Sequence, residues 1–252
     1  MSGDAAFFDL DRTLMAGSSG LPFARAAHRA GMISRRQMAR WGVEHVRFRL
    51  RGANEEASAV ILAEVREVLR GVSATSVQRM IPEALAGILP RVYPQMLEEV
   101  YAHQDAGRAT FIVSAAGSGI VETLAHVLGM SGGIGTRYGV DPGGRFTGEL
   151  DGPFMYGEGK VEAMRRVAAT QELDLWRSWA YSDAASDLPM LRAVAHPVAV
   201  NPDTALATVA IEAGWRVMRF ERLGRRLAIA GTTAATIAVG GIGTVLAGRR
   251  RR

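Results

Sequence analysis

Two carboxylates and a hydroxyl stand at alternate positions near the start of the chain: Asp9, Asp11 and Thr13. They follow the apolar run of residues 5–8, which is typical of a buried strand. Because side chains alternate along an extended chain, we expect the three to point the same way at the strand's carboxyl end. Carboxylates this close resist joint ionisation unless a cation such as Mg²⁺ neutralises them. An ordinary Asp-rich turn is the alternative, because aspartate favours turns.

Three later segments also carry polar groups at places where chemistry is expected. Each group follows an apolar run or begins a predicted helix: Ser114 and Ala115 after residues 111–113, Lys160 at the start of a helix to about residue 169, and Asp183 and Asp187 after residues 179–182. A helix N-terminus favours bound anions. The alternatives are structural, because serine and aspartate often only cap helices and a lone lysine is usually solvated.

In this order the four segments resemble motifs I to IV of the haloacid dehalogenase superfamily of phosphotransferases, over roughly residues 5–220. The closest likeness is to subfamily IB, the phosphoserine-phosphatase-like hydrolases, in the actinobacterial type with a hydrophobic C-terminal tail. The resemblance implies Mg²⁺-dependent hydrolysis of a small phosphate monoester through an aspartyl-phosphate intermediate.

The resemblance also assigns a role to each candidate residue. Asp9 would be the nucleophile and Asp11 the general acid and then the general base. Thr13, Ser114, the amide of Ala115 and Lys160 would bind the phosphate, and Lys160 would also neutralise charge on the nucleophile. The metal ligands would be Asp9, the carbonyl of Asp11 and Asp183, with Asp187 behind them or as an additional ligand.

Three positions depart from the pattern of this family. Ser18 stands where phosphoserine phosphatases place a glutamate for the substrate's ammonium group, and Ser186 stands where asparagine is common. Arg12 replaces a small residue, and we expect its side chain to point outward into solvent. The substrate therefore stays open between phosphoserine and another small or lipid-like monoester of lysophospholipid-like or histidinol type. A membrane-associated regulatory protein with little turnover is the rival from another functional class.

The elements that must hold these residues alternate along the chain. Predicted strands at residues 5–8, from 109, at 179–182, 197–200 and 216–220 are separated by helical patterns, among them residues 94–105 and 118–128. This order predicts an α/β fold, by resemblance an HAD-like Rossmannoid parallel sheet with helices on both faces. A hairpin is expected at residues 136–140 and 145–150. We assign residues 1–16 and 88–222 to the catalytic core and residues 17–87 to a small helical cap.

Composition narrows the class of partner. The 252 residues include no cysteine, and the formal charge of +5 would be −2 without seven arginines at or after residue 222. This distribution argues against nucleic acid as a partner and suits an anionic membrane surface better. The N-terminus lacks a basic stretch followed by an apolar run, so we expect no signal peptide and a cytoplasmic catalytic body.

The tail, residues 223–252, differs from the rest of the chain. Residues 227–247 carry no charge over about 21 residues, and arginines flank them on both sides. That length is enough to cross a hydrocarbon core, so we expect a C-terminal helix that anchors the enzyme to the membrane. A row of small residues, Gly240, Thr244 and Gly248, could support a tail-mediated dimer. The alternatives are a disordered tail or a helix packed on the domain.

Overall fold

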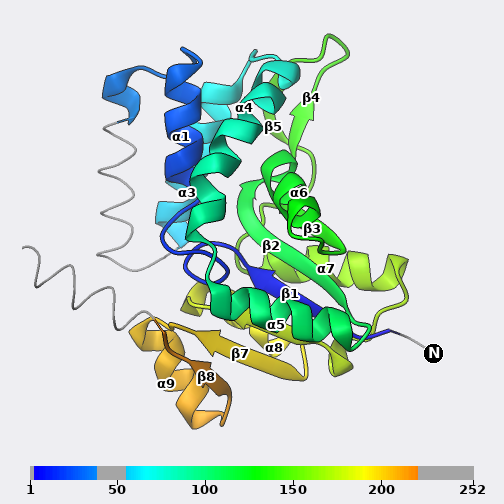
Figure 1. Cartoon of the computed structure of the whole chain (residues 1–252). Coiled ribbons are helices and arrows are strands. Elements are labelled where there is room, and N and C mark those ends of the chain that lie inside the picture. The colour runs from blue at the N-terminus through cyan, green and yellow to red at the C-terminus, as the bar shows by residue number, and fades with distance from the viewer. Residues whose placement is uncertain (1–2, 39–54, 221–252) are drawn as a thin grey trace, which may run out of the picture. The chain divides into compact units, whose positions relative to one another are not determined.

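The protein, as a computed structural model, is described for residues 3–38 and 55–220 (Figure 1). Its centre is a six-stranded sheet in the order β3-β2-β1-β6-β7-β8. The strands are β1 (Ala5–Asp9), β2 (Ala109–Gly117), β3 (Gly132–Thr136), β6 (Trp179–Ser182), β7 (His196–Val200) and β8 (Arg216–Met218). Parallel pairing joins the strands from β3 through β7, which confirms the predicted α/β fold.

Strand β1 lies in the middle of the sheet, and all five of its residues are buried. Phe7 stacks on Phe111 of β2, with 5.4 Å between ring centroids. Phe8 points to the opposite face and stacks on Tyr181 of β6 at 4.5 Å. A strand that buries apolar groups on both faces needs a helical layer on each side.

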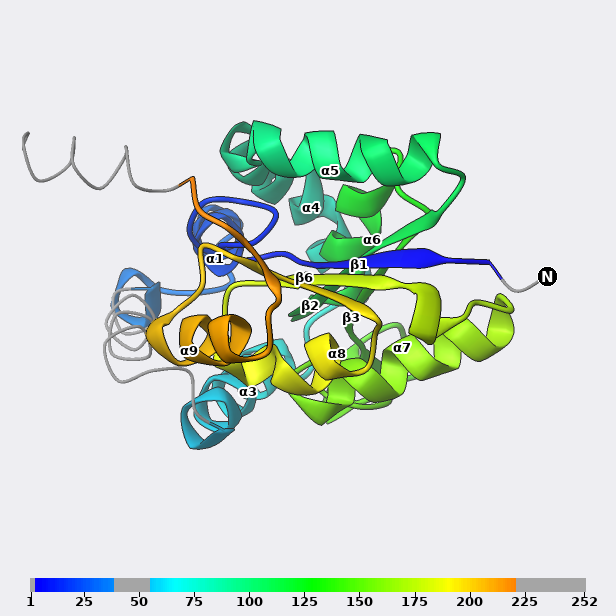
Figure 2. The ribbon, with the colours of Figure 1, turned by 90° about the horizontal axis from the view of Figure 1, so that it is seen from below.

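Helices supply both layers (Figure 2). Helix α5 (Pro94–Asp105) covers one face, and its bounds are those expected from the sequence. Helices α7 (Glu158–Thr170), α8 (Leu188–Arg192) and α9 (Thr204–Glu212) lie on the other face. Short 3-10 turns, η1 (Leu89–Arg91), η2 (Leu175–Arg177) and η3 (Ala185–Asp187), connect these elements. The apolar residues of α7 and α8 pack against Phe7 and Val113 in one core cluster.

A second group of elements gathers at one end of the sheet (Figure 1). It contains α1 (Gly20–Arg29), α3 (Glu55–Leu69), α4 (Ala74–Ile88) and the antiparallel hairpin of β4 (Tyr138–Val140) and β5 (Phe146–Leu150). The backbone amide of Gly71 donates to the carbonyl of Phe146 at 2.8 Å, and that of Ala74 donates to Gly144 at 2.9 Å. The predicted hairpin therefore forms, and it is bonded to the loop that joins α3 to α4.

The sequence did not indicate strand β3. Its segment, Gly132–Thr136, contains three glycines and one large apolar residue, so it lacks a strand pattern. Packing explains the composition, because a Cβ on Gly133 would lie 2.6 Å from the backbone of Val121 in α6 (Ser118–Val127). Thr136, which the hairpin was expected to contain, ends β3 instead.

The predicted tail helix at residues 227–247 lies outside the described residues. Within residues 3–38 and 55–220, no helix is both long and apolar enough to cross a membrane.

Candidate active site

Four buried polar side chains meet at the carboxyl end of the sheet. Lys160 of α7 donates from Nζ to Asp9 Oδ1 and to Asp187 Oδ2, each at 2.7 Å. The hydroxyl of Ser182, at the end of β6, also donates to Asp187 Oδ2 at 2.7 Å. We call these four residues the lysine network. The structure thus brings together Asp9, Lys160 and Asp187, which the sequence predicted from segments up to 178 positions apart. It adds Ser182 as a hydrogen-bond partner of Asp187.

The loop before α7 is what buries the lysine. A side chain at Gly159 would overlap the backbone carbonyl of Phe154, so the segment closes only around a glycine. Gly157 adopts a positive φ of 52° and begins the helix. Lys160 then lies in the first turn with only 3% of its surface exposed. The glycines around Lys160 therefore position it toward the sheet.

The lysine network contains two carboxylates and one cation. Burial raises the pKa of Asp9 to about 7, against the opposing effect of Lys160, and the nearby Asp187 raises it further. Burial and the charge of Asp9 raise the pKa of Asp183 well above its usual range. Burial alone would lower the pKa of Lys160, but Asp187 and Asp9 raise it instead. Carboxylates held together in this way favour an added cation.

Arg12 supplies part of that charge, which corrects the prediction that it points into solvent. Its Nη1 atom lies 3.0 Å from Asp183 Oδ2, and its side chain is 35% exposed against 5% for Asp183. The reason is tertiary, because the buried carboxylate follows strand β6, which is distant in sequence. Asp183 and Asp187 are themselves buried, so the alternative of a solvated helix cap does not hold.

Asp11 is held by the loop that precedes α1. Its Oδ2 accepts a hydrogen bond from the Ser18 hydroxyl at 3.0 Å, and its Oδ1 accepts one from the Ser19 amide at 2.8 Å. Ser18, noted in the sequence as an exception to the family pattern, therefore binds the candidate general acid. Within the described residues Asp11 makes no hydrogen bond to the lysine network, so the two candidate catalytic carboxylates have separate partners.

Three further predicted phosphate ligands, Thr13, Ser114 and Ala115, belong to segments next to the carboxyl end of β1: Thr13 follows the strand, and the other two lie within β2. Asp9 is paired with Val113 across these strands, so Ser114 follows directly beside it. Ser114 is buried, and its Oγ accepts a bond from the Ala116 amide at 3.2 Å. The Ala115 carbonyl accepts a bond from Thr136 at 2.9 Å. Thr13 is fully buried, and its hydroxyl has no hydrogen-bond partner among the described residues.

The sequence did not single out Asp203, which supports the loop of Asp183 and Asp187. Asp203 accepts from the Ala185 amide at 3.0 Å and from the Leu206 amide at 2.7 Å, and its own amide donates to the Asp183 carbonyl at 2.8 Å. It caps α9 and fixes the loop that carries Asp183 and Asp187. A signal was present, since an aspartate after a strand and before an apolar helical pattern is a typical N-cap.

The residues present suit a hard divalent cation. Asp9 and Asp183 offer oxygen ligands, and Asp183 Oδ2 is buried with no hydrogen bond among the described residues. A grouping of three or more acidic or histidine side chains able to hold a metal does not occur in the described part of the chain. A cation here would therefore need a backbone carbonyl and water beside the two carboxylates.

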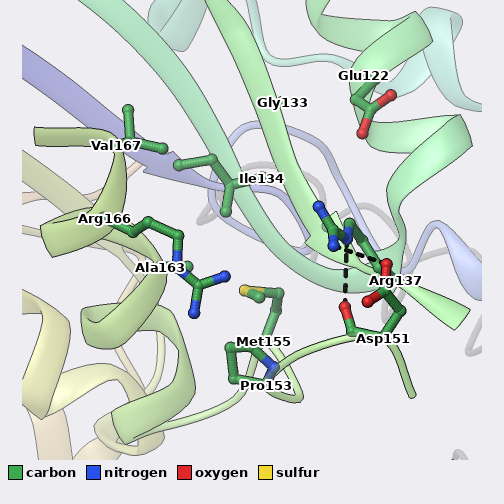
Figure 3. A pocket seen from close by; sticks show the side chains of 11 residues that line it. Glu122, Gly133, Ile134, Arg137, Asp151, Pro153, Met155, Ala163, Arg166 and Val167 are labelled. Carbon is green, nitrogen blue, oxygen red and sulfur yellow. Dashed lines mark hydrogen bonds and ion pairs between the residues drawn. The ribbon is translucent and has the colours of Figure 1, made fainter. Parts of the chain in front are cut away.

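A separate pocket of about 180 Å³ lies between β3, α7 and the segment before α7 (Figure 3). Ile134, Met155 and Ala163 line it, and the ion pair of Arg137 with Asp151 lies at its side. None of the residues predicted for catalysis lines this pocket.

Known proteins resemble this chain over most of its length. Residues 6–192 match the model of the family described as haloacid dehalogenase-like hydrolase. The chain is 38% identical over 219 residues to the "Inhibition of morphological differentiation protein" of Streptomyces azureus, covering 86% of this chain and 79% of that protein. It is 35% identical over 254 residues to phosphoserine phosphatase SerB1 of Mycobacterium tuberculosis, covering 98% and 81%. A solved protein of unknown function from Bordetella pertussis Tohama I has a TM-score of 0.74 at 28% identity, covering 86% of this chain and 99% of that one.

Proposed function

The chain belongs to the haloacid dehalogenase-like hydrolases and is a phosphatase of that family, and we propose that it cleaves a small phosphate monoester through an aspartyl-phosphate on Asp9. The observation that carries this proposal is the bridge that Lys160 makes between Asp9 and Asp187, at 2.7 Å to each, at the carboxyl end of a central strand. A buried cation bonded to one oxygen of a carboxylate favours its ionised form and leaves the other oxygen for attack.

In the first step, Asp9 Oδ2 attacks the phosphorus atom and the bond from phosphorus to the ester oxygen breaks. Asp11 gives its proton to the departing oxygen. In the second step, Asp11 takes a proton from water, the water oxygen attacks phosphorus, and the bond to Asp9 breaks to release phosphate. Because Ser18 and Ser19 hold both oxygens of Asp11, its carboxyl group must turn from this loop to reach the substrate.

Mg²⁺ would be held by Asp9, Asp183 and the carbonyl of Asp11, and when bound it would neutralise phosphate oxygens. The raised pKa values of Asp9 and Asp183 support this assignment, because two buried carboxylates with this surplus of negative charge favour a cation. Ser114 and the amide of Ala115 would hold the phosphate beside the start of α6.

The test is hydrolysis of p-nitrophenyl phosphate by the full chain with Mg²⁺ and with EDTA. We expect Asp9→Asn and EDTA each to abolish turnover, while Asp105→Asn, at the exposed end of α5, retains it. Mass spectrometry of acid-quenched enzyme should find phosphate on Asp9. Turnover that survives both EDTA and Asp9→Asn would contradict the proposal.

The substrate we propose is phosphoserine or a chemically similar small monoester. The relative named phosphoserine phosphatase supports this class, whereas Ser18 gives position 18 no carboxylate for an ammonium group. A panel of O-phosphoserine, histidinol phosphate and a lysophosphatidic acid separates the options by kcat/KM. A clear preference for the lipid ester would replace phosphoserine by the lipid-like alternative.

The rival function is regulatory binding with little turnover. The ion pair of Arg12 with Asp183 favours it, because a cation of the chain itself already occupies a carboxylate that the reaction needs. This rival requires that the Mg²⁺-loaded chain hydrolyse none of the panel esters above the rate of Asp9→Asn.

We also propose that residues 227–247 attach the enzyme to the cytoplasmic face of a membrane. Support comes from the sequence alone, an uncharged run between basic flanks. Fractionation should place the full chain with membranes and a chain ending at Arg222 in the soluble fraction, at both low and high salt. Equal distribution of the two would contradict the anchor.

A further inference from the structure

The guanidinium group of Arg12 lies on the carboxylate that the proposed function assigns to the metal. We infer that Arg12 is a built-in counter-ion of Asp183, which a divalent cation must displace in order to bind. The inference rests on the proposed function, and it concerns the strength and control of metal binding rather than the reaction steps. It predicts that the enzyme binds Mg²⁺ more weakly than its carboxylates alone would allow.

The backbone around Arg12 is the first observation. Arg12 has a φ of 64°, in the left-handed region that favours glycine. It lies at the centre of a tight turn, in which the amides of Leu14 and Met15 both donate to the carbonyl of Leu10, at 3.1 and 3.0 Å. A large side chain in this conformation is a strained choice, and such strain concentrates at functional sites.

The contact itself is the second observation. Nη1 of Arg12 lies 3.0 Å from Asp183 Oδ2, yet this oxygen makes no hydrogen bond of good geometry in the described residues. The pair is therefore held by charge and not locked by directional bonding. Because a third of the Arg12 side chain is exposed, the guanidinium can leave toward solvent, while the buried Asp183 cannot follow.

The charges around Asp183 indicate that Arg12 lowers the affinity for Mg²⁺. Asp9, Asp183 and Asp187 bring three carboxylates together, and Lys160 and Arg12 oppose them. A guanidinium and a divalent cation on one carboxylate repel each other strongly at short range. Binding of the cation therefore requires the Arg12 contact to break, and the free energy of that contact is lost from the affinity.

The experiment measures Mg²⁺ binding to the full chain by isothermal titration calorimetry, without substrate. Arg12→Gln removes the charge at similar length, and Arg12→Gly removes both the charge and the backbone strain. Arg12→Lys keeps the charge. Arg166→Gln is the matched control, since Arg166 pairs with Glu162 on an exposed face of α7.

We expect Arg12→Gln and Arg12→Gly to bind Mg²⁺ about tenfold more tightly, a change that equals about 1.4 kcal/mol. Arg12→Lys and the Arg166→Gln control should bind as the native chain does. Thermal unfolding gives an independent readout: in EDTA, Arg12→Gln should melt several degrees below the native chain, and saturating Mg²⁺ should remove most of that difference. The gap between Arg12→Gly and Arg12→Gln isolates the strain.

Equal or weaker Mg²⁺ binding in Arg12→Gln and Arg12→Gly would overturn the inference and leave the proposed phosphatase untouched, because hydrolysis is assayed separately. Equal binding would mean that Arg12 does not act on the metal, and weaker binding would mean that Arg12 helps to build the metal or phosphate site. A native chain and variants that all fail to bind Mg²⁺ would overturn both this inference and the metal in the proposed function. Active, EDTA-sensitive enzyme with unchanged affinity overturns the inference alone.

Discussion

Two polar networks meet at consecutive buried residues of β6, Tyr181 and Ser182. Because neighbouring side chains of a strand point to opposite faces, the two networks lie on opposite sides of the sheet. Ser182 belongs to the lysine network. Tyr181 belongs to a second one, which we call the tyrosine network, formed with His103 and Glu99 of α5 and Arg216 of β8.

The four members of the tyrosine network are all hydrogen-bonded within it. The Tyr181 hydroxyl donates to Glu99 at 2.9 Å and accepts from His103 Nε2 at 2.8 Å. Arg216 binds both oxygens of Glu99, at 2.8 and 2.6 Å. Although burial acts to raise it, the pKa of Glu99 is lowered by its bonds to Arg216 and Tyr181. Each charged group has an opposite partner, and such networks contribute rigidity and stability.

The lysine network is the opposite case, because it holds two carboxylates and one cation. The pKa of its member Asp9 is raised, as is that of the neighbouring Asp183. A buried surplus of one charge costs stability unless a ligand compensates it, and it is typical of functional sites. The comparison teaches that burial and hydrogen bonding alone do not mark an active site. The two networks differ in the direction of the pKa shift, which is upward for Asp9 and downward for Glu99.

Lys160→Met should give the largest effect. Lys160 is the one cation bonded to Asp9 in the part of the chain that the structure describes. Its removal leaves the nucleophile beside Asp187 and Asp183, so kcat/KM should fall by about 10³-fold or more. Arg216→Met removes the corresponding cation of the tyrosine network and should lower activity only slightly while reducing stability. Comparable losses of activity in the two folded variants would break the distinction between the networks.

Tyr181→Phe should show the reverse pattern. It removes a hydroxyl that bonds both His103 and Glu99, so we expect the free energy of unfolding to fall by about 1–3 kcal/mol. Turnover at a temperature where the variant is folded should stay near the native value. Urea unfolding and the p-nitrophenyl phosphate assay measure the two quantities, and Ser182→Ala is the neighbouring comparison that should lose activity.

The pH dependence of stability tests the role of His103 in the tyrosine network. Burial, aided by the charge of Arg108, lowers the pKa of His103 to about 4 from its ordinary value of 6.5. Between these values the unfolded chain binds a proton that the folded chain excludes, so stability from this group is complete above pH 6.5 and is lost as the pH falls toward 4. The drop in unfolding free energy from pH 7.5 to pH 5 should be smaller in His103→Gln. An unchanged drop would show that His103 is not the titrating group.

Ser18→Ala should give the smallest effect. The variant removes one hydrogen bond to Asp11 but leaves the bond from the Ser19 amide, so kcat should change by about two- to tenfold. Ser76→Ala, on an exposed part of α4, is the control. A loss as large as that of Lys160→Met would place Ser18 in the reaction itself.

Much of this protein could be read from local pattern. The apolar runs predicted β1, β2, β6 and β7, and Pro94 together with Gly107 marked the ends of α5. The three charged residues of the lysine network were named because each stands at or soon after the end of a strand or at a helix start, and parallel topology gathers such places at one edge. The domain boundaries, the metal and the tail remain predictions.

Tertiary structure decided the rest, for a common physical reason. Strand β3 is glycine-rich because α6 packs on its backbone, and this constraint comes from a neighbour. The tyrosine network joins α5 to β6 and β8 without any shared spacing. Arg12 carries no local sign of its partner, and only the fold places the buried Asp183 within 3.0 Å of it. Local pattern reports the energetics of a segment, whereas the partner of a buried charge depends on which distant segment the fold brings beside it.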